Sequence, residues 1–181
     1  MHVGDGGLAG MLVFTPAPVT DDRGFFTRTF DAAVARSAGL DPTAFVQDSQ
    51  SRSHLGVVRG LHLRTGAGEA KLVRCSYGTV FDVVVDLRIG SETFGNWVSI
   101  RLDDVDNRTV YIPAGCGHGF QAMTEPADIC YRIDQPHEPG HDMTVRWDDE
   151  QLAVRWPLPV TTMSERDRAA RPLQDQLGRL H

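Results

Sequence analysis

The segment GTVFDVVVD at residues 78–86 is the clearest core strand of this 181-residue chain. Side chains of a strand alternate between two faces, so odd positions from 81 to 87 share one face and even positions from 80 to 86 share the other. Two runs precede it, VVRGLH at 57–62 and KLVR at 71–74, and they supply a guanidinium, an imidazole and an ammonium. Such groups beside a core strand either decorate a surface or line a pocket inside a barrel. The pocket interpretation would bring together a phosphate binder, a base and an oxyanion partner.

Further strand-like runs recur along the chain, separated by turns rich in Gly, Pro, Asp and Asn. They lie at residues 11–15, 25–30, 72–76, 97–102, 110–112, 127–133, 143–147 and 152–156. This spacing predicts an all-β fold, an antiparallel sandwich or barrel, because the strand–helix alternation of a doubly wound sheet and any GxGxxG motif are absent.

Short helices are expected near the N-terminal third and at the C-terminus. Asp31 is a suitable N-cap for a helix over 32–38 that stops at Gly39. Ser164 opens a second helix, since residues 164–167 have capping-box spacing. The prediction is a single domain over 1–181. Within it, the Gly-rich segment 1–10 is loosely held and 164–181 forms a C-terminal helical tail.

The composition excludes several classes of protein. With 41% hydrophobic and 23% charged residues, the chain suits one globular domain that buries roughly 70% of its unfolded surface. A net charge of −6 argues against binding nucleic acid or anionic membranes. No apolar run approaches the ~18 residues of a membrane span, and the first residues do not resemble a signal peptide. Cys75, Cys116 and Cys130 form no CxxC pair, so we expect reduced thiols in a cytoplasmic protein.

Each candidate polar residue has an ordinary structural explanation when it is taken alone. His62 could be a structural histidine just ahead of the core strands, and Lys71 could guard a strand edge. His118 lies between glycines, either in a solvent-facing turn or in a turn aimed into a barrel mouth. Tyr131 fits a core tyrosine, and Asp167 fits the third position of a capped helix. Arg59 and Gln47 carry no signal of their own.

A metal site is not expected. A cupin-type metal site needs a His-x-His pair, and the residue two positions after His62 is Arg64, a cation unsuited to metal ligation.

Taken together, the segments resemble the family of dTDP-4-dehydrorhamnose 3,5-epimerase from about Phe14 to Leu173. The matching segments are DRGFF (22–26), QD (47–48), SRS (51–53), RGLH (59–62), KLVR (71–74), FDV (81–83), VDLR (85–88), Ser91 with TFG (93–95), YIP (111–113), GHGF (117–120), Trp147 with Asp149, WP (156–157), and Ser164 with Asp167. The resemblance implies a cupin-like jelly roll, a homodimer, no metal or redox cofactor, and a dTDP-4-keto-6-deoxyhexose substrate.

The resemblance also implies roles for individual residues. His62 would be the general base, oriented by Asp167, and Tyr131 would be the acid on the opposite face of the sugar. Lys71 would lie beside the C4 oxygen. Sugar and diphosphate contacts would come from Arg59, Gln47 and His118, and Arg23 and Phe26 would reach the nucleotide, expected from the partner subunit.

Three positions depart from the family pattern. His137 stands where a second tyrosine often helps to shape the sugar site, which leaves open whether C3, C5 or both are inverted. Arg28 stands where a carboxylate commonly meets the thymine, and Arg166 replaces the usual lysine before Asp167. The alternatives are a C3-only or C5-only epimerase of antibiotic-sugar biosynthesis, a noncatalytic cupin that binds a sugar nucleotide, and a metal-dependent cupin oxygenase or isomerase.

Overall fold

The computed structural model describes residues 1–138 and 140–180. Its strands are β1 (His2–Asp5), β2 (Leu12–Thr15), β3 (Val19–Asp21), β4 (Gly24–Phe26), β5 (Gln47–Ser53), β6 (Val58–Arg64), β7 (Lys71–Tyr77), β8 (Thr79–Asp86), β9 (Trp97–Asp103), β10 (Thr109–Ile112), β11 (Cys116–Ala122), β12 (Ala127–Ile133) and β13 (Asp142–Thr144). The helices are α1 (Ala32–Ser37), α2 (Glu165–Arg168) and the 3₁₀ helix η1 (Leu173–Arg179).

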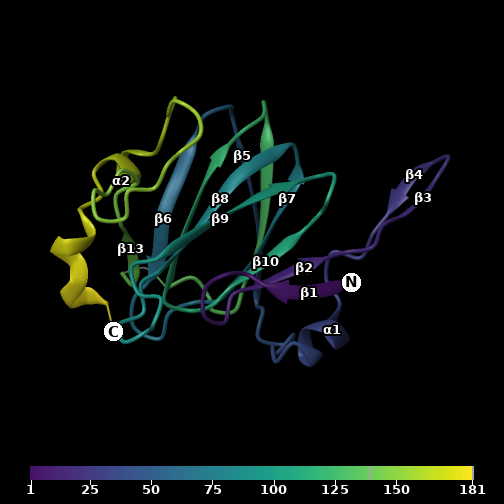
Figure 1. Cartoon of the computed structure of the whole chain (residues 1–181), viewed down its shortest axis with the longest axis horizontal. Coiled ribbons are helices and arrows are strands. Elements are labelled where there is room, and N and C mark those ends of the chain that lie inside the picture. The colour runs from purple at the N-terminus through teal and green to yellow at the C-terminus, as the bar shows by residue number, and fades with distance from the viewer. Residues whose placement is uncertain (139, 181) are drawn as a thin grey trace.

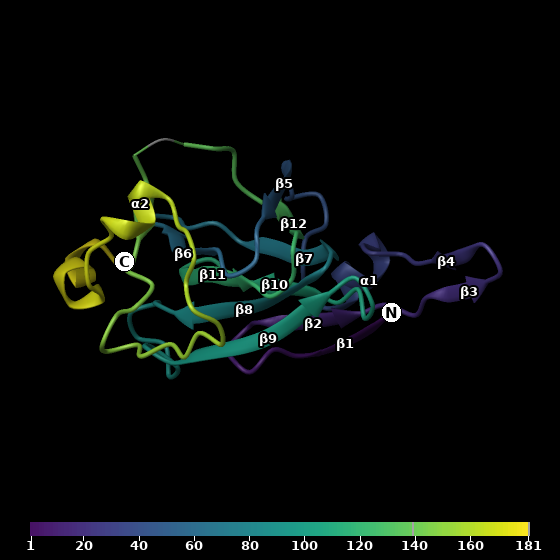
Figure 2. The same cartoon turned by 90° about the horizontal axis from the view of Figure 1, so that it is seen from above.

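Two antiparallel sheets face each other, which confirms the expected all-β class (Figures 1 and 2). One has six strands in the order β1-β2-β10-β7-β12-β5, and the other has five in the order β13-β6-β11-β8-β9. The hairpin β3–β4 belongs to neither sheet and projects away from the body of the molecule (Figures 1 and 2). Among the described residues, we find no helix with the length and apolarity to cross a membrane.

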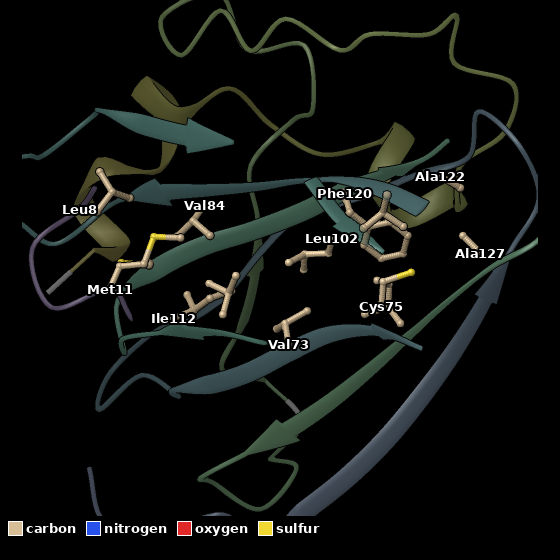
Figure 3. Packing of buried hydrophobic residues seen from close by; sticks show 14 residues of the cluster. Leu8, Met11, Val73, Cys75, Val84, Leu102, Ile112, Phe120, Ala122 and Ala127 are labelled. Atoms are coloured by element: carbon tan, nitrogen blue, oxygen red, sulfur yellow. The ribbon is translucent and has the colours of Figure 1, made fainter. Parts of the chain in front are cut away.

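Both faces of β8 are buried, and this explains its run of valines. Even positions such as Val80 and Val84 belong to the cluster between the sheets, which also contains Val73 of β7 and Phe120 of β11 (Figure 3). Odd positions such as Val83 pack on the other side of the five-stranded sheet, in a second cluster that includes residues of the C-terminal segment. The sequence predicted this division between the two faces correctly. Full burial of one such side chain contributes about 1.5–3 kcal/mol.

The capping predictions are also confirmed. The Asp31 side chain accepts hydrogen bonds from the first turn of α1, and Gly39 follows that helix with a φ of 84°. Ser164 Oγ accepts from the Asp167 amide at the start of α2. α2 and η1 fall in the tail expected at 164–181, and His181 lies outside the described residues.

The structure departs from the predictions in three segments of the chain. Residues 1–10, expected to be loosely held, contribute β1, which pairs with β2, and Leu8, which is 3% exposed in the main core. Backbone pairing and this apolar anchor outweigh the glycine content. Residues 152–156, expected as a strand, form none, and Leu152 and Trp156 pack in the second cluster instead. The strand predicted at 25–30 is the shorter β4.

Candidate active site

Residues from five strands, β5, β6, β7, β11 and β12, line a cavity of about 260 Å³ between the two sheets. His62 of β6 and His118 of β11 approach it from the five-stranded sheet, where they pair directly in register. Lys71 of β7 and Tyr131 of β12 approach it from the six-stranded sheet. The first pair of side chains therefore lies across the cavity from the second.

A second cavity of about 190 Å³ shares His62, Lys71 and Ile133 with the first, so the two are continuous. Eight of the twelve residues proposed from the sequence line one or both of them: Gln47, Arg59, His62, Lys71, His118, Tyr131, His137 and Arg166. A ninth, Asp167, lies behind His62.

His62 and Asp167 form a tight pair, although 105 positions separate them in the sequence. The His62 Nε2–H donates to Asp167 Oδ1 at 2.6 Å, and the Asp167 side chain is only 3% exposed. Burial by itself raises the pKa of Asp167, but hydrogen bonds from His62 and Ser164 outweigh it and hold the pKa below the ordinary value. Since the carboxylate can only accept, Nδ1 of His62 remains as the ring nitrogen that can take a proton.

His118 forms a second histidine–carboxylate pair, with Asp82 of β8. The His118 Nε2–H donates to Asp82 Oδ2 at 2.8 Å, and the Asp82 side chain is fully buried. The imidazole lies edge-to-face against the Tyr131 ring, with ring centroids 6.1 Å apart. His118 lies within strand β11, so the turn expected around it is wrong.

Glycines bring β6 and β11 close together beside the two histidines. A Cβ at Gly60 would lie 2.5 Å from the Gly119 Cα, and one at Gly119 would lie 2.8 Å from the Arg59 carbonyl oxygen. Neither position has room for a side chain, so the close backbone approach expected from the glycines around His118 is confirmed.

Burial raises the pKa of Tyr131 above its ordinary value, because ionising the phenol in this cavity would place a charge away from water. Ser51 Oγ lies 3.4 Å from the Tyr131 hydroxyl oxygen. The phenol therefore stays protonated at neutral pH, the form that can give up a proton.

Arg23, Phe26 and Arg28 do not line the cavities of their own chain. Arg23 and Phe26 lie on the projecting β3–β4 hairpin, where the Phe26 side chain is 73% exposed (Figure 1). Arg23 pairs with Asp21 at 2.6 Å and Arg28 with Asp31 at 2.8 Å.

The comparison with known proteins decides the family. The sequence model described as dTDP-4-dehydrorhamnose 3,5-epimerase matches residues 6–175. The chain belongs to this family. It is 42% identical over 166 residues to the dTDP-4-dehydrorhamnose 3,5-epimerase of Pseudomonas aeruginosa, covering 91% of this chain and 92% of that protein. It is 41% identical over 165 residues to the dTDP-4-dehydrorhamnose 3-epimerase of Streptomyces niveus, covering 91% and 80% respectively.

Among solved structures, the fold is similar to NovW, a 4-keto-6-deoxy sugar epimerase from the novobiocin biosynthetic gene cluster of Streptomyces spheroides. The TM-score is 0.93 with 39% identity, over 97% of this chain and 89% of that one. The cupin-like jelly roll is thereby confirmed. The protein is a dTDP-sugar epimerase that acts on a 4-keto-6-deoxyhexose beside its ketone.

The sequence interpretation missed three charged residues at this epimerase site. Glu69 and Arg64 line the second cavity, and Asp82 holds His118. Asp82 did carry a signal, because it is a carboxylate on the strand face that also presents Val80 and Val84 to the core. Glu69 carried none, since it lies in a loop between β6 and β7.

Among residues 1–138 and 140–180, no group of three or more His, Cys, Asp or Glu side chains is arranged to hold a metal ion. What the site does offer is an imidazole and a phenol from opposite sheets, with an ammonium beside them.

Proposed function

We propose that His62 is the general base and Tyr131 the general acid in epimerisation of a dTDP-4-keto-6-deoxyhexose. The observation that carries this proposal is the placement of the two groups on facing sheets around one cavity. A sugar ring held between the sheets would present one face to the imidazole and the other to the phenol. Removal of a proton by one group and return by the other then inverts the carbon.

The protons to be moved are on carbons next to the C4 ketone. Removing one places negative charge on the ketone oxygen, and Lys71 supplies a preformed ammonium for that oxygen. Loss of one such oxyanion donor typically costs about 10²–10³-fold in rate. General base catalysis by a positioned imidazole contributes about 10²–10⁴-fold. Asp167 favours the imidazolium that forms, because its carboxylate accepts from Nε2.

Arg59, Gln47, His118, His137 and Arg166 are proposed to bind the substrate. Arg59 is fixed by donating from Nε to Ser53 Oγ at 3.0 Å and from Nη2 to the Arg52 carbonyl at 3.0 Å. A guanidinium held in this way suits a diphosphate, which it can contact with two parallel hydrogen bonds. Binding energy from the nucleotide end then holds the sugar ring in place for the reaction.

The nucleotide end of the site is proposed to be completed by a second copy of the chain. Arg23, Phe26 and Arg28 lie on or beside a hairpin whose apolar residues Val19 (68%) and Phe25 (58%) are largely exposed. An arm of this kind favours docking on another protomer. Analytical ultracentrifugation should give a dimer, and deletion of residues 19–26 should give a monomer with weakened dTDP binding.

The test of the activity is solvent deuterium wash-in at C3 and C5 of the keto sugar, followed by NMR. Incorporation at both carbons with net inversion supports a 3,5-epimerase. Incorporation at one carbon alone would select a mono-epimerase, the second candidate, which stays open because the chain is as similar to a 3-epimerase (41%) as to a 3,5-epimerase (42%) and His137 departs from the family pattern. Incorporation at neither carbon with folded protein that binds dTDP would leave only a noncatalytic binding protein.

A further inference from the structure

The ammonium of Lys71 is held by a carboxylate that none of the proposed roles accounts for. Glu69 Oε1 lies 3.0 Å from Lys71 Nζ, and Glu69 Oε2 lies 3.2 Å from Arg64 Nη2. The side chains are 9% exposed for Lys71, 11% for Glu69 and 7% for Arg64. One carboxylate therefore bridges two nearly buried cations, and all three side chains line the cavity that His62 shares.

Further contacts fix the Arg64 side chain and the backbone beside Glu69. Arg64 donates from Nη1 to the Pro136 carbonyl at 2.7 Å. Ala70, next to Glu69, donates its amide to Asp134 Oδ1 at 2.7 Å and accepts from the Asp134 amide at 3.2 Å. Because Arg64 occupies one carboxylate oxygen, the carboxylate has little freedom to turn its other oxygen away from Lys71.

We infer that Glu69, backed by Arg64, is a positioning residue for the epimerisation, which aims the Lys71 ammonium at the C4 oxygen of the sugar. This inference rests on the proposed role of Lys71. A lysine has a flexible four-carbon stem and three N–H donors. One donor directed at Glu69 fixes the ammonium and leaves the other two for the substrate oxygen. Misplacement of a catalytic group by about 1 Å can cost on the order of 10²-fold in rate.

The first test replaces Glu69 by Gln. The amide keeps the shape of the side chain, but its single oxygen can serve only one of the two cations, and its NH2 then faces the other. We expect kcat and the deuterium wash-in rate to fall about tenfold or more, with dTDP affinity and KM within about a factor of two of the wild type. Unchanged kcat would overturn the inference, and so would a fall in affinity alone.

A double-mutant cycle separates positioning from a general structural role. If Glu69 acts through Lys71, then Glu69→Gln adds no further loss to Lys71→Gln, and the double variant exchanges deuterium at the rate of the single Lys71→Gln variant. If the two losses multiply, Glu69 acts independently of Lys71 and the inference fails. Slow exchange in these variants is measured over long incubations.

A second variant covers the case in which Glu69→Gln does not fold because Arg64 is left without its partner. Arg64→Gln combined with Glu69→Gln removes both buried charges together and still frees Lys71. The inference predicts the same loss of about tenfold in wash-in for this pair. A double variant as active as the wild type would contradict it.

The matched control is Glu125→Gln. Glu125 is an exposed carboxylate that pairs with His54 at 2.6 Å, outside both cavities. Its substitution should leave wash-in unchanged, so a comparable loss there would count against a specific role for Glu69. Absence of exchange in the wild type would refute the proposed function itself. Exchange in the wild type with an unaffected Glu69→Gln variant would refute only the positioning role.

Discussion

The two histidine–carboxylate pairs at the active site of this epimerase have similar hydrogen bonds and very different surroundings. His62 donates to Asp167 at 2.6 Å and His118 donates to Asp82 at 2.8 Å, and both carboxylates are buried. The His62 side chain is 35% exposed in its cavity, whereas that of His118 is 5% exposed. A paired carboxylate therefore does not by itself mark a general base. An imidazole must also have room to meet a carbon acid and to release the proton afterwards.

The two histidines differ in exposure because their carboxylate partners come from different parts of the fold. Asp82 comes from β8, the strand next to β11 in the same sheet, so the second pair is locked into the sheet. Asp167 comes from α2, a single helical turn that packs on β6 from outside the sheets. Placing the carboxylate behind the ring leaves the other side of His62 free for a ligand. This difference supports the proposal that His62 transfers the proton and His118 contacts the substrate.

The largest effect is expected from His62→Asn. Deuterium exchange at both carbons should fall by about 10²–10⁴-fold, since His62 combines a buried carboxylate partner with a side chain that is 35% exposed in the cavity. Binding of dTDP, measured by calorimetry, should survive because His62 is proposed to contact the sugar rather than the nucleotide. If His118→Asn reduced exchange to the same extent, the proposed difference in role between His62 and His118 would be wrong.

Tyr131→Phe should separate removal of the proton from its return. The ring remains against His118, but the hydroxyl that lies 3.4 Å from Ser51 Oγ is lost. We expect some deuterium wash-in to persist, because His62 can still remove and return a proton on its own face. Net inversion, followed by NMR of the product, should fall by about 10²-fold or more. Equal loss of wash-in and inversion would count against Tyr131 as the opposite-face acid.

Much of this arrangement could be predicted from local sequence. The segment at 78–86 predicted a core strand with its odd and even positions on separate faces, and the spacing from Ser164 to Asp167 predicted the cap of α2. Both patterns are local: side-chain alternation and helix capping each depend on residues only a few positions apart. The family resemblance then named His62, Lys71 and Tyr131, residues whose types alone fit ordinary structural roles.

The remainder depended on contacts between distant segments. β5 was missed because its sequence, QDSQSRS, is entirely polar and shows no alternation, and it is held by its pairing with β12. β11 was interpreted as a turn because of its glycines, which instead allow β6 and β11 to approach closely. The bridge from Arg64 through Glu69 to Lys71 joins a strand end, a loop and a strand start, and no local pattern encodes it.

A smaller effect is expected from His118→Asn. Since His118 is nearly buried and held by Asp82, we expect it to contribute a hydrogen bond to the substrate rather than to move a proton. Loss of one hydrogen bond to a charged or strongly polar ligand group costs about 1.5–3 kcal/mol, which corresponds to at least a tenfold rise in KM. Steady-state kinetics should show this rise with kcat changed by less than tenfold. A fall in kcat with unchanged KM would place His118 in the chemistry.

The smallest effect concerns stability in acid. The pKa of Asp167 is lowered in the folded protein, because the hydrogen bonds from His62 and Ser164 outweigh the effect of burial. A depressed carboxyl pKa stabilises the fold above the unfolded value of about 3.9, and that stabilisation is lost as the pH falls through the folded value. Urea unfolding at a series of pH values from 6 downward should therefore show a steeper loss of unfolding free energy below about pH 4 in the wild type than in Asp167→Asn. Parallel curves would mean that the carboxylate orients His62 without stabilising the fold through its charge.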